Sequence, residues 1–271
     1  MRVREYGASA AGRPVILLPM PHPALPSRRP GLAEMVERTR LRLWRHLARG
    51  EGVECPCCGE RFRRFVPYGV PRRPAAQCPA CGAVERHRLL WLFLRERTDL
   101  FVRPQRLLHV APEEVFAARL RALPSLRYLS ADLASPRAML RADVQRLPLP
   151  DASFDAILCH HVLEHVPDDR AAMGELLRVL RPGGWALLQS PIRSRLAATL
   201  EDPAVTDPRE RERLYGQSDH LRQYGRDYEA RLHEAGFEVR AARFFEALPP
   251  ERRARYGLKA ETIWLCRRPA S

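Results

Sequence analysis

The feature that most constrains the fold of this chain is the stretch over residues 154–191. Its first six residues, 154–159, form a short apolar run of the kind that a sheet buried on both faces needs. Asp168 and Asp169 can accept hydrogen bonds from the free amides of a following helix, and Pro182-Gly183-Gly184 ends that helix before a second apolar run. This pattern predicts a strand–helix–strand unit with ionisable side chains at the carboxyl end of its first strand, where open α/β sheets bind ligands.

The same alternation of strands and helices continues on both sides of that stretch. We expect a first helix over residues 112–123 and a late helix over residues 224–235. Strands that alternate with helices predict an α/β fold with a doubly wound, mostly parallel sheet. The further expected strands cover residues 106–110, 126–131, 139–142, 237–244 and 262–267.

Two Cys-x-x-Cys pairs with nineteen residues between them indicate a small metal-binding module. Four thiolates at this spacing are typical of a structural zinc ribbon, whose coordination sphere is closed. Apolar spacing predicts a helix over 32–49 that packs against the ribbon, and a linking helix over 84–101 in which His87 either reaches a substrate or stays solvated. The expected zinc ligands are Cys55, Cys58, Cys78 and Cys81.

These signals predict three parts in the chain. Residues 1–31 are rich in proline without periodicity and are expected to form a poorly ordered arm. Residues 32–104 hold the ribbon with its two helices, and residues 105–271 hold the α/β domain. Unpaired cysteines beside a metal site favour a reducing, cytoplasmic location. No apolar run approaches the ~18 residues of a membrane span, so no membrane association is expected.

The positive charge of the chain is concentrated in its N-terminal part. The formal net charge is +14, and residues 1–106 alone, with 21 Arg against 9 Asp and Glu, contribute +12. A basic lobe with interleaved aromatic residues is suited to an anionic partner such as single-stranded RNA. The alternative is a skew in base composition, since Lys259 is the only lysine. Both readings stay open at this point.

Two carboxylates stand at the ends of expected strands on the ligand-binding edge. Asp132 follows the second strand, nineteen residues after Glu113, the usual distance from a first βα turn to an acid that holds ribose hydroxyls. Asp143 follows the third strand and is placed to accept from an exocyclic amine. Together these two aspartates predict a nucleoside site.

The stretches ADVQRLPLPDASFDAILCHHVLEHVPDD and LLRVLRPGGWALL resemble the class I S-adenosylmethionine-dependent methyltransferases, and more narrowly methyltransferase type 11. The resemblance covers roughly residues 105–268, and with the ribbon it extends to residues 55–268, as in ribbon-bearing bacterial members. It implies a Rossmann-like sheet of seven strands with an antiparallel last strand, and S-adenosylmethionine as cofactor. The nucleoside residues implied are Asp132 and Leu133 at the ribose, and Asp143 and Val144 near the adenine.

The chain departs from this family in the first βα turn. The family pattern is acidic–x–Gly–x–Gly–x–Gly, whereas residues 109–115 read HVAPEEV and contain no glycine. Ala111 and Pro112 then form the turn, His109 replaces the customary acid, and Glu113 can accept from the cofactor's ammonium group. The alternative is a non-enzymatic zinc-ribbon binding protein whose cofactor site has degenerated.

Histidines near the predicted edge are the candidates for proton transfer, because imidazole titrates near neutrality. The resemblance implies that His160 lies beside the methionine end of the cofactor and that His161 faces the acceptor. His220 and its neighbour Asp219, in the long excursion over residues 192–223, compete for the role of general base. We therefore expect methyl transfer to O or N of a small-molecule or saccharide acceptor, with RNA as the alternative acceptor. Glu164 and His165 are expected to be structural.

Overall fold

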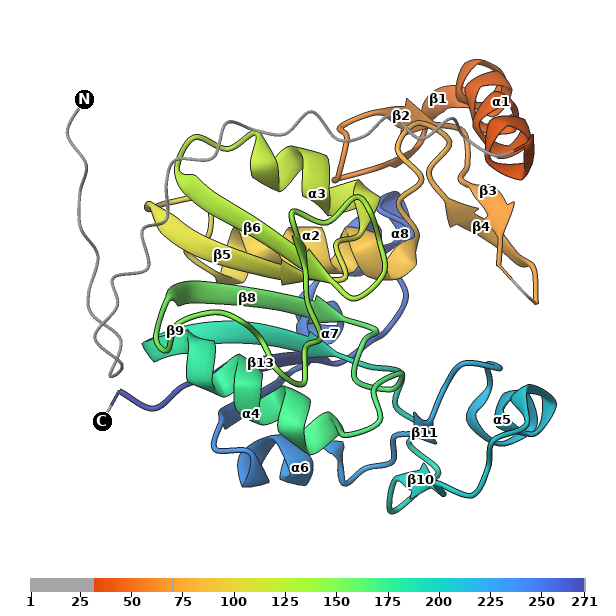
Figure 1. Ribbon diagram of the computed structural model, residues 1–271. Coiled ribbons are helices and arrows are strands. Elements are labelled where there is room, and N and C mark those ends of the chain that lie inside the picture. The colour runs from red at the N-terminus through yellow and green to blue at the C-terminus, as the bar shows by residue number, and fades with distance from the viewer. Residues whose placement is uncertain (1–31, 70, 271) are drawn as a thin grey trace.

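A computed structural model describes residues 32–69 and 71–270, and the arm predicted for residues 1–31 lies outside them (Figure 1). Its centre is a seven-stranded sheet in the order β12-β13-β9-β8-β5-β6-β7. All pairs are parallel except those of β13, which runs antiparallel to both neighbours. The predicted sheet is therefore confirmed. Its strands are β5 (Gln105–Val110), β6 (Leu126–Asp132), β7 (Leu140–Arg141), β8 (Phe154–His160), β9 (Leu180–Gln189), β12 (Glu238–Ala242) and β13 (Ile263–Arg267).

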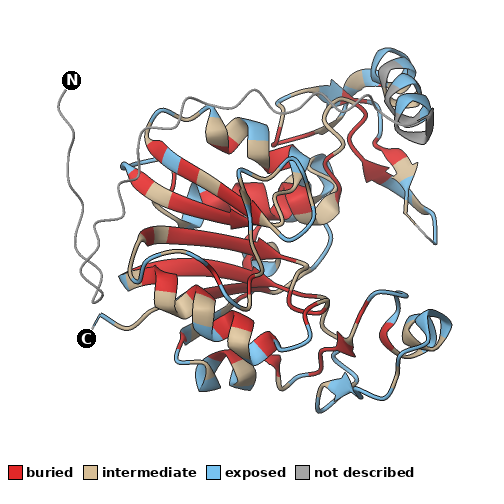
Figure 2. Ribbon diagram, viewed as in Figure 1, coloured by how far each residue is buried: buried red, intermediate tan, exposed pale blue. Residues whose placement is uncertain are grey.

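Helices cover both faces of the sheet, so its central strands are buried on both sides (Figure 2). In β5, Leu107 belongs to one apolar cluster and the adjacent Leu108 to the other, as the alternation of side chains along a strand requires. The first cluster packs α2 (Glu85–Arg97), α3 (Glu114–Arg121) and α7 (Phe244–Ala247), and the second packs α4 (Asp169–Val179) and α6 (Tyr228–Glu234).

The helix start predicted near Asp168 forms through that residue alone. The Oδ1 of Asp168 accepts a hydrogen bond from the amide of Ala171 at 2.9 Å and caps α4. Asp169 is instead buried and accepts from the hydroxyl of Tyr224 at 2.6 Å and from Arg231 at 3.2 Å. The buried Asp169 therefore links α4 to Tyr224 and to Arg231 of α6.

The turn after α4 requires a glycine for a steric reason. A Cβ on Gly184 would lie 2.9 Å from the carbonyl oxygen of Arg181 and 3.0 Å from that of Asp155. The close approach lets β9 begin at Leu180 and continue with a register shift beside β8. The Pro-Gly-Gly signal therefore marks an irregularity within the strand.

The ribbon consists of two hairpins and docks on the sheet domain. Its strands are β1 (Arg49–Glu54), β2 (Arg61–Phe62), β3 (Val66–Tyr68) and β4 (Arg73–Gln77). Arg88 of α2 is fully buried, and its guanidinium donates to the carbonyls of Ala76 and Ala83 in the ribbon and of Tyr256 and Gly257 after α8 (Pro250–Arg255). One buried cation thus joins ribbon, linking helix and C-terminal segment.

The first described helix differs from expectation in its packing. Helix α1 (Leu32–Leu47) forms as predicted, and Trp44 packs against the ribbon's cluster. Four apolar side chains are nevertheless more than half exposed, so the prediction that this face packs is wrong for them. They are Met35, Val36, Leu43 and Leu47.

The excursion after β9 folds into β10 (Leu200–Glu201), α5 (Pro208–Tyr215) and β11 (Arg222–Gln223). Arg222 anchors it, because its guanidinium donates to the carbonyls of Leu163 and Val166 in the loop after β8 and pairs with Glu201. The excursion and the ribbon both lie on the side toward which β8 and β9 point (Figure 1). Among the helices of the described residues, none has the length and apolar character needed to cross a membrane.

Candidate functional site

The turn after β5 keeps a glycine-like backbone although it contains no glycine. Ala111 stands at the family's first glycine position and has φ +46°, in the left-handed region that glycine occupies most easily. Its amide donates to the carbonyl of Ala131 at 2.8 Å, which holds the turn beside β6. The chain therefore retains the conformation of this turn without its usual residue.

Glu113 is the ionised centre of a first cluster at this turn. Its Oε1 lies 2.8 Å from Nε2 of His87, its Oε2 lies 2.9 Å from Nδ1 of His160, and the guanidinium of Arg86 is 3.7 Å away. Burial opposes ionisation, yet the hydrogen bonds from His160 and His87 hold the pKa of Glu113 well below 4.5. A fixed negative charge therefore stands at the start of α3.

His87 and Arg86 are site residues that the sequence did not assign. The amide of Val84 donates to Nδ1 of His87 at 3.2 Å, so Nε2 carries the hydrogen that Glu113 accepts. His87 is buried, which corrects the expectation of a solvated residue. The sequence shows these polar residues at the ERHR start of the helix that leaves the ribbon, but no local pattern connects this helix to the turn.

His109 and His160 complete the first cluster from below the turn. Nδ1 of His109 lies 3.0 Å from the hydroxyl of Tyr128, and complete burial lowers the pKa of His109 to about 3. His109 is thus neutral where the family has an acid, and Glu113 carries the charge. The Nε2 atoms of His109 and His160 are buried without a hydrogen-bond partner among the described residues.

The nucleoside residues lie at the ends of β6 and β7. Oδ1 of Asp132 accepts from the amides of Ala134 and Ser135 at 2.8 Å and 2.7 Å, which orients the carboxylate. Asp143 accepts from the amide of Gln145 at 2.9 Å in the same manner. Leu133 is 61% exposed and Val144 is buried. These turns present two oriented carboxylates beside an uncovered apolar side chain, which suits an adenosine.

A second cluster stands at the end of β8. His161 has φ +53°, and its Nδ1 lies 3.2 Å from Oε1 of the buried Glu164, whose Oε2 accepts from the hydroxyl of Ser190 at 2.8 Å. Burial alone would raise the pKa of Glu164, but the hydrogen bond from His161 lowers this pKa overall. Glu164 is therefore a charged group at the candidate acceptor side.

The excursion brings His220 against this second cluster. Its Nδ1 donates to the carbonyl of Tyr215 at 3.2 Å, and its ring centre lies 4.7 Å from that of His165. Burial lowers the pKa of His220. Asp219 lies with its carboxylate 3.3 Å from Nδ1 of His165, so the Asp-His pair suggested by the sequence forms with His165.

The four ribbon thiols converge as zinc ligands do. The Sγ atoms of Cys55 and Cys81 are 3.6 Å apart, and those of Cys58 and Cys78 are 3.7 Å apart. Tetrahedral zinc with Zn–S bonds of about 2.3 Å separates its sulfurs by about 3.8 Å. The thiols therefore fit one zinc ion, while Cys57 turns its Sγ toward the carbonyl of His87 at 3.7 Å.

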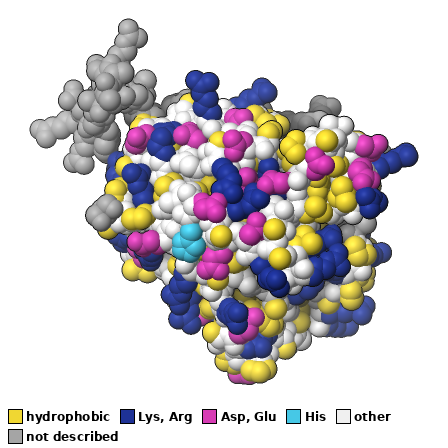
Figure 3. All heavy atoms as spheres, turned by 90° about the horizontal axis from the view of Figure 1, so that it is seen from below, with side chains coloured by type: hydrophobic (Ala, Val, Ile, Leu, Met, Phe, Trp, Pro, Cys, Tyr) yellow, Lys and Arg dark blue, Asp and Glu magenta, His cyan; other side chains and the backbone are white. Residues whose placement is uncertain are grey.

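Two of the ribbon arginines, Arg61 and Arg73, form ion pairs within the protein. Figure 3 shows the side of the molecule that lies away from the ribbon, and basic and acidic side chains are interspersed there. Mixed charge of this kind is unlike the single-sign stripe of a nucleic-acid surface. The ion pairs in and around the ribbon join Arg45 to Glu60, Arg61 to Glu51 and Glu54, Arg73 to Glu85, and Arg255 to Glu54.

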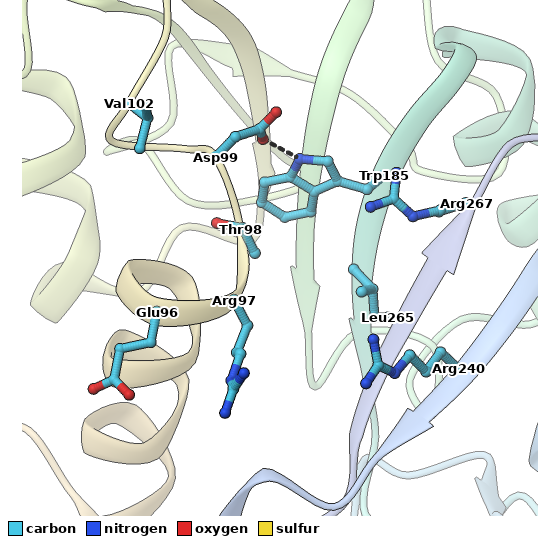
Figure 4. Close-up of a pocket in the computed structure, with 9 residues that line it drawn as sticks. All are labelled: Glu96, Arg97, Thr98, Asp99, Val102, Trp185, Arg240, Leu265 and Arg267. Carbon is cyan, nitrogen blue, oxygen red and sulfur yellow. Dashed lines mark hydrogen bonds between the residues drawn. The ribbon is translucent and has the colours of Figure 1, made fainter.

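A hollow of about 520 Å³ lies at the other end of the strands (Figure 4). Trp185, in the middle of β9, donates through its indole to Asp99 at 3.1 Å there, and Arg97, Arg240 and Arg267 line the hollow. None of the predicted site residues contributes to it. The two clusters at the carboxyl ends therefore remain the candidate site.

Comparisons with known proteins agree with the topology. Residues 105–188 match the model of the methyltransferase domain family. A protein of Mycolicibacterium smegmatis named "probable S-adenosylmethionine-dependent methyltransferase" is 37% identical over 89 residues, which cover 31% of this chain and 35% of that protein. The 27-O-demethylrifamycin SV methyltransferase of Amycolatopsis mediterranei is 35% identical over 116 residues, covering 43% and 41%. The chain thus spans about two fifths of the length of these relatives.

A solved S-adenosylmethionine-dependent methyltransferase from Mesorhizobium loti is 18% identical, with a TM-score of 0.45 over 66% of this chain and 98% of that one. Residues 105–188, from β5 into β9, therefore resemble the methyltransferase domain family, and the strand order with an antiparallel β13 is that of a Rossmann-like sheet.

Proposed function

We propose that this protein transfers a methyl group from S-adenosylmethionine to an oxygen or nitrogen of a small-molecule acceptor. The observation that carries the proposal is the ionised Glu113, fixed by His87 and His160 at the first turn of a methyltransferase domain. When bound, the cofactor supplies a methyl group activated by its sulfonium. The buried, unpartnered Nε2 atoms of His109 and His160 and the left-handed Ala111 fit a site that a polar ligand completes.

The chain's own residues have distinct tasks toward this cofactor. Glu113 accepts from its ammonium group, in the place where the family has glycine. Asp132 accepts from the ribose hydroxyls and Asp143 from the adenine amine. The remaining contacts come from Ala111 and Pro112 at the turn, Leu133 at the ribose, Val144 at the adenine, and His109 and His160 at the methionine end.

The acceptor side of the site belongs to the second cluster. Glu164 accepts from Nδ1 of His161, which leaves the lone pair of Nε2 available, and that Nε2 is buried without a partner among the described residues. His161 is therefore the general base in this proposal, and positioning supplies most of the rate. His220 and Asp219 close the acceptor side from the excursion.

Zinc at the four ribbon cysteines has a structural role in this proposal. The ribbon holds α2, and α2 carries His87 to Glu113. The ion therefore acts on the cofactor site only through the position of this helix. A closed shell of four thiolates leaves no coordination position for chemistry.

Isothermal titration of the full chain with S-adenosylmethionine tests the proposal. Binding is expected in the wild type, with a roughly tenfold to hundredfold loss of affinity in Asp132→Ala and Glu113→Gln, because each removes a hydrogen bond to a charged or buried group. The exposed Glu114 offers the matched control Glu114→Gln. If the wild type does not bind S-adenosylmethionine at high micromolar concentrations, the proposed methyl transfer is refuted. The alternative of a non-enzymatic zinc-ribbon binding protein would then be supported.

The acceptor class is tested by a second measurement. A small-molecule or saccharide acceptor predicts that RNA binds weakly and without effect on turnover. An RNA acceptor predicts binding that falls steeply with salt, because each phosphate contact releases a counterion. Steep salt dependence together with methylated RNA would replace the small-molecule proposal.

A further inference from the structure

We propose that Glu164, His165 and His220 form a binding site for a divalent transition-metal ion, and that this ion holds the hydroxyl oxygen of the methyl acceptor. The positions of these three side chains support the metal site itself, whereas the role of the ion in the reaction depends on the proposed methyl transfer. The ribbon cysteines form a separate group in the same chain.

The three side chains converge from two segments that are distant in sequence. One ligand atom of each lies within 4.8 Å of the others. Around one zinc ion, bonds of about 2.0–2.2 Å to nitrogen and oxygen keep ligand atoms about 3–4 Å apart. Adjustments of the side-chain torsions bring the three ligand atoms to the spacing that one ion requires. The backbone already holds the segments together, since the amide of Leu221 donates to the carbonyl of Glu164 at 2.8 Å.

The hydrogen bonds of the two imidazoles leave their metal-binding nitrogens free. Nδ1 of His220 faces the carbonyl of Tyr215 at 3.2 Å, and a carbonyl only accepts, so Nδ1 carries the hydrogen and Nε2 the lone pair. This Nε2 is buried and has no partner among the described residues. Nδ1 of His165 faces the carbonyl of Asp219 at 3.3 Å in the same way. An imidazole that donates its other N–H to a backbone carbonyl is the usual arrangement of a metal ligand.

Glu164 supplies the negative charge that such a site needs. It is 1% exposed, and its oxygens already accept from His161 and Ser190, which orients the carboxylate toward the remaining imidazoles. A buried carboxylate is stabilised by an adjacent cation. Oxygen of Glu with two imidazole nitrogens suits zinc and neighbouring divalent ions better than magnesium or calcium.

The number of ligands points to an open site. Two histidines and one glutamate leave at least one coordination position for water or substrate, as in hydrolytic zinc sites, whereas the four ribbon cysteines leave none. The side chains of His161 and His165 are 27% and 32% exposed, so the cluster is accessible from solvent. The acceptor is therefore an oxygen nucleophile that reaches the ion from this side.

The ion polarises the acceptor hydroxyl, which lowers its pKa. The O–H bond of the acceptor breaks, and its proton passes to Nε2 of His161. A lone pair of the oxygen forms the new O–CH₃ bond, and the electron pair of the S–CH₃ bond returns to sulfur, so the sulfonium becomes a thioether. The step needs no further reactant.

Cobalt(II) binding to the full chain tests the site. Elemental analysis of the wild type, after metal depletion and reloading with cobalt, is expected to give two ions per chain. The absorption spectrum is expected to show the sulfur-to-cobalt charge-transfer band of thiolates for one of these ions and not for the other. His165→Ala and Glu164→Gln are expected to retain only the thiolate-bound ion. His165 is partly exposed and Glu→Gln preserves shape, so both variants should fold. His233→Ala is the matched control, because Nδ1 of His233 also bonds a carbonyl, that of Phe237 at 3.1 Å.

One ion per chain in the wild type, bound only by thiolates, would overturn the metal site. Two ions in His165→Ala and Glu164→Gln would do the same. A chelator that removes only the second ion is expected to stop methyl transfer while S-adenosylmethionine still binds. Two bound ions without any cofactor binding would refute the proposed methyl transfer and leave the metal site standing.

Discussion

Two glutamates, the half-buried Glu113 and the buried Glu164, follow neighbouring strands, and the residues around them differ. Glu113 follows β5 and Glu164 follows β8, and each bonds imidazole nitrogens. Hydrogen bonds from histidine lower the pKa of both, although burial alone would raise it. A left-handed residue directly follows each strand, Ala111 after β5 and His161 after β8. The two glutamates therefore share the same kind of hydrogen bond and the same backbone conformation after the strand.

The difference lies in what encloses each glutamate. Both oxygens of Glu113 accept from imidazole N–H groups, one of them on the helix that leaves the ribbon, so the position of its charge is fixed. Around Glu164 the excursion contributes His220 instead, whose bond to a carbonyl leaves a nitrogen lone pair directed inward. The first cluster therefore suits a charged ligand, and the second suits a metal ion.

Loss of the ribbon zinc is expected to break the first cluster and spare the second. Cys78→Ser removes one of four thiolates, and structural zinc is worth about 10 kcal/mol or more of apparent folding free energy in small domains. We expect the ribbon to unfold, the melting temperature to fall and S-adenosylmethionine affinity to drop at least tenfold, because α2 loses its support.

Thermal melts, zinc release and cofactor titration check this prediction. Cys57→Ala is the control, since Cys57 lies between the ligands in sequence but turns its Sγ toward the carbonyl of His87. Unchanged cofactor affinity in Cys78→Ser would show that the ribbon and the first cluster are independent.

The fold was predictable from sequence because it depends on local signals. Apolar runs, the cap at Asp168 and the glycine turn each act within a few residues, and the seven strands lie where their patterns predict. The excursion gave no such signal, since β10 and β11 are two residues each and depend on the long-range anchor of Arg222.

The placement of the candidate site residues was predictable only for residues that stand at or just after the end of a strand. Asp132 and Asp143 lie at strand ends as expected. The partner of Glu113 was not predictable, since His87 reaches it from 26 residues away through the docking of α2. Likewise His165, expected to be structural, meets His220 only through the fold of the excursion.

Neutralising one glutamate at a time distinguishes the roles proposed for the two clusters. Glu113→Gln is expected to weaken S-adenosylmethionine binding by about 2–3 kcal/mol, the value of a hydrogen bond to a charged group. Glu164→Gln is expected to leave that affinity within about twofold and to lower turnover instead. Titration and initial rates of both variants separate the two. Equal losses of affinity would mean that both glutamates serve the cofactor.

The first cluster also predicts an acid-sensitive stability. His109 is neutral in the fold with a pKa of about 3, against 6.5 for the free side chain, so the unfolded chain binds more protons and stability falls as pH drops below 6.5. Between pH 7 and 5 this group alone costs about 2 kcal/mol. Urea midpoints at both pH values check this, and His109→Gln should reduce the difference by that amount. An undiminished slope in His109→Gln would place the acid sensitivity elsewhere.

The smallest expected effects come from the two left-handed residues. Left-handed backbone costs a non-glycine residue about 1 kcal/mol, partly offset by the greater freedom of glycine in the unfolded chain, so Ala111→Gly should stabilise by about 0.5 kcal/mol. His161→Gly gains the same relief but deprives the buried Glu164 of a charge-assisted hydrogen bond, and should destabilise by about 1 kcal/mol. Urea unfolding of both variants measures the difference. Two stabilising substitutions would mean that Glu164 is held without His161, and the general base would then have to be sought elsewhere in the second cluster.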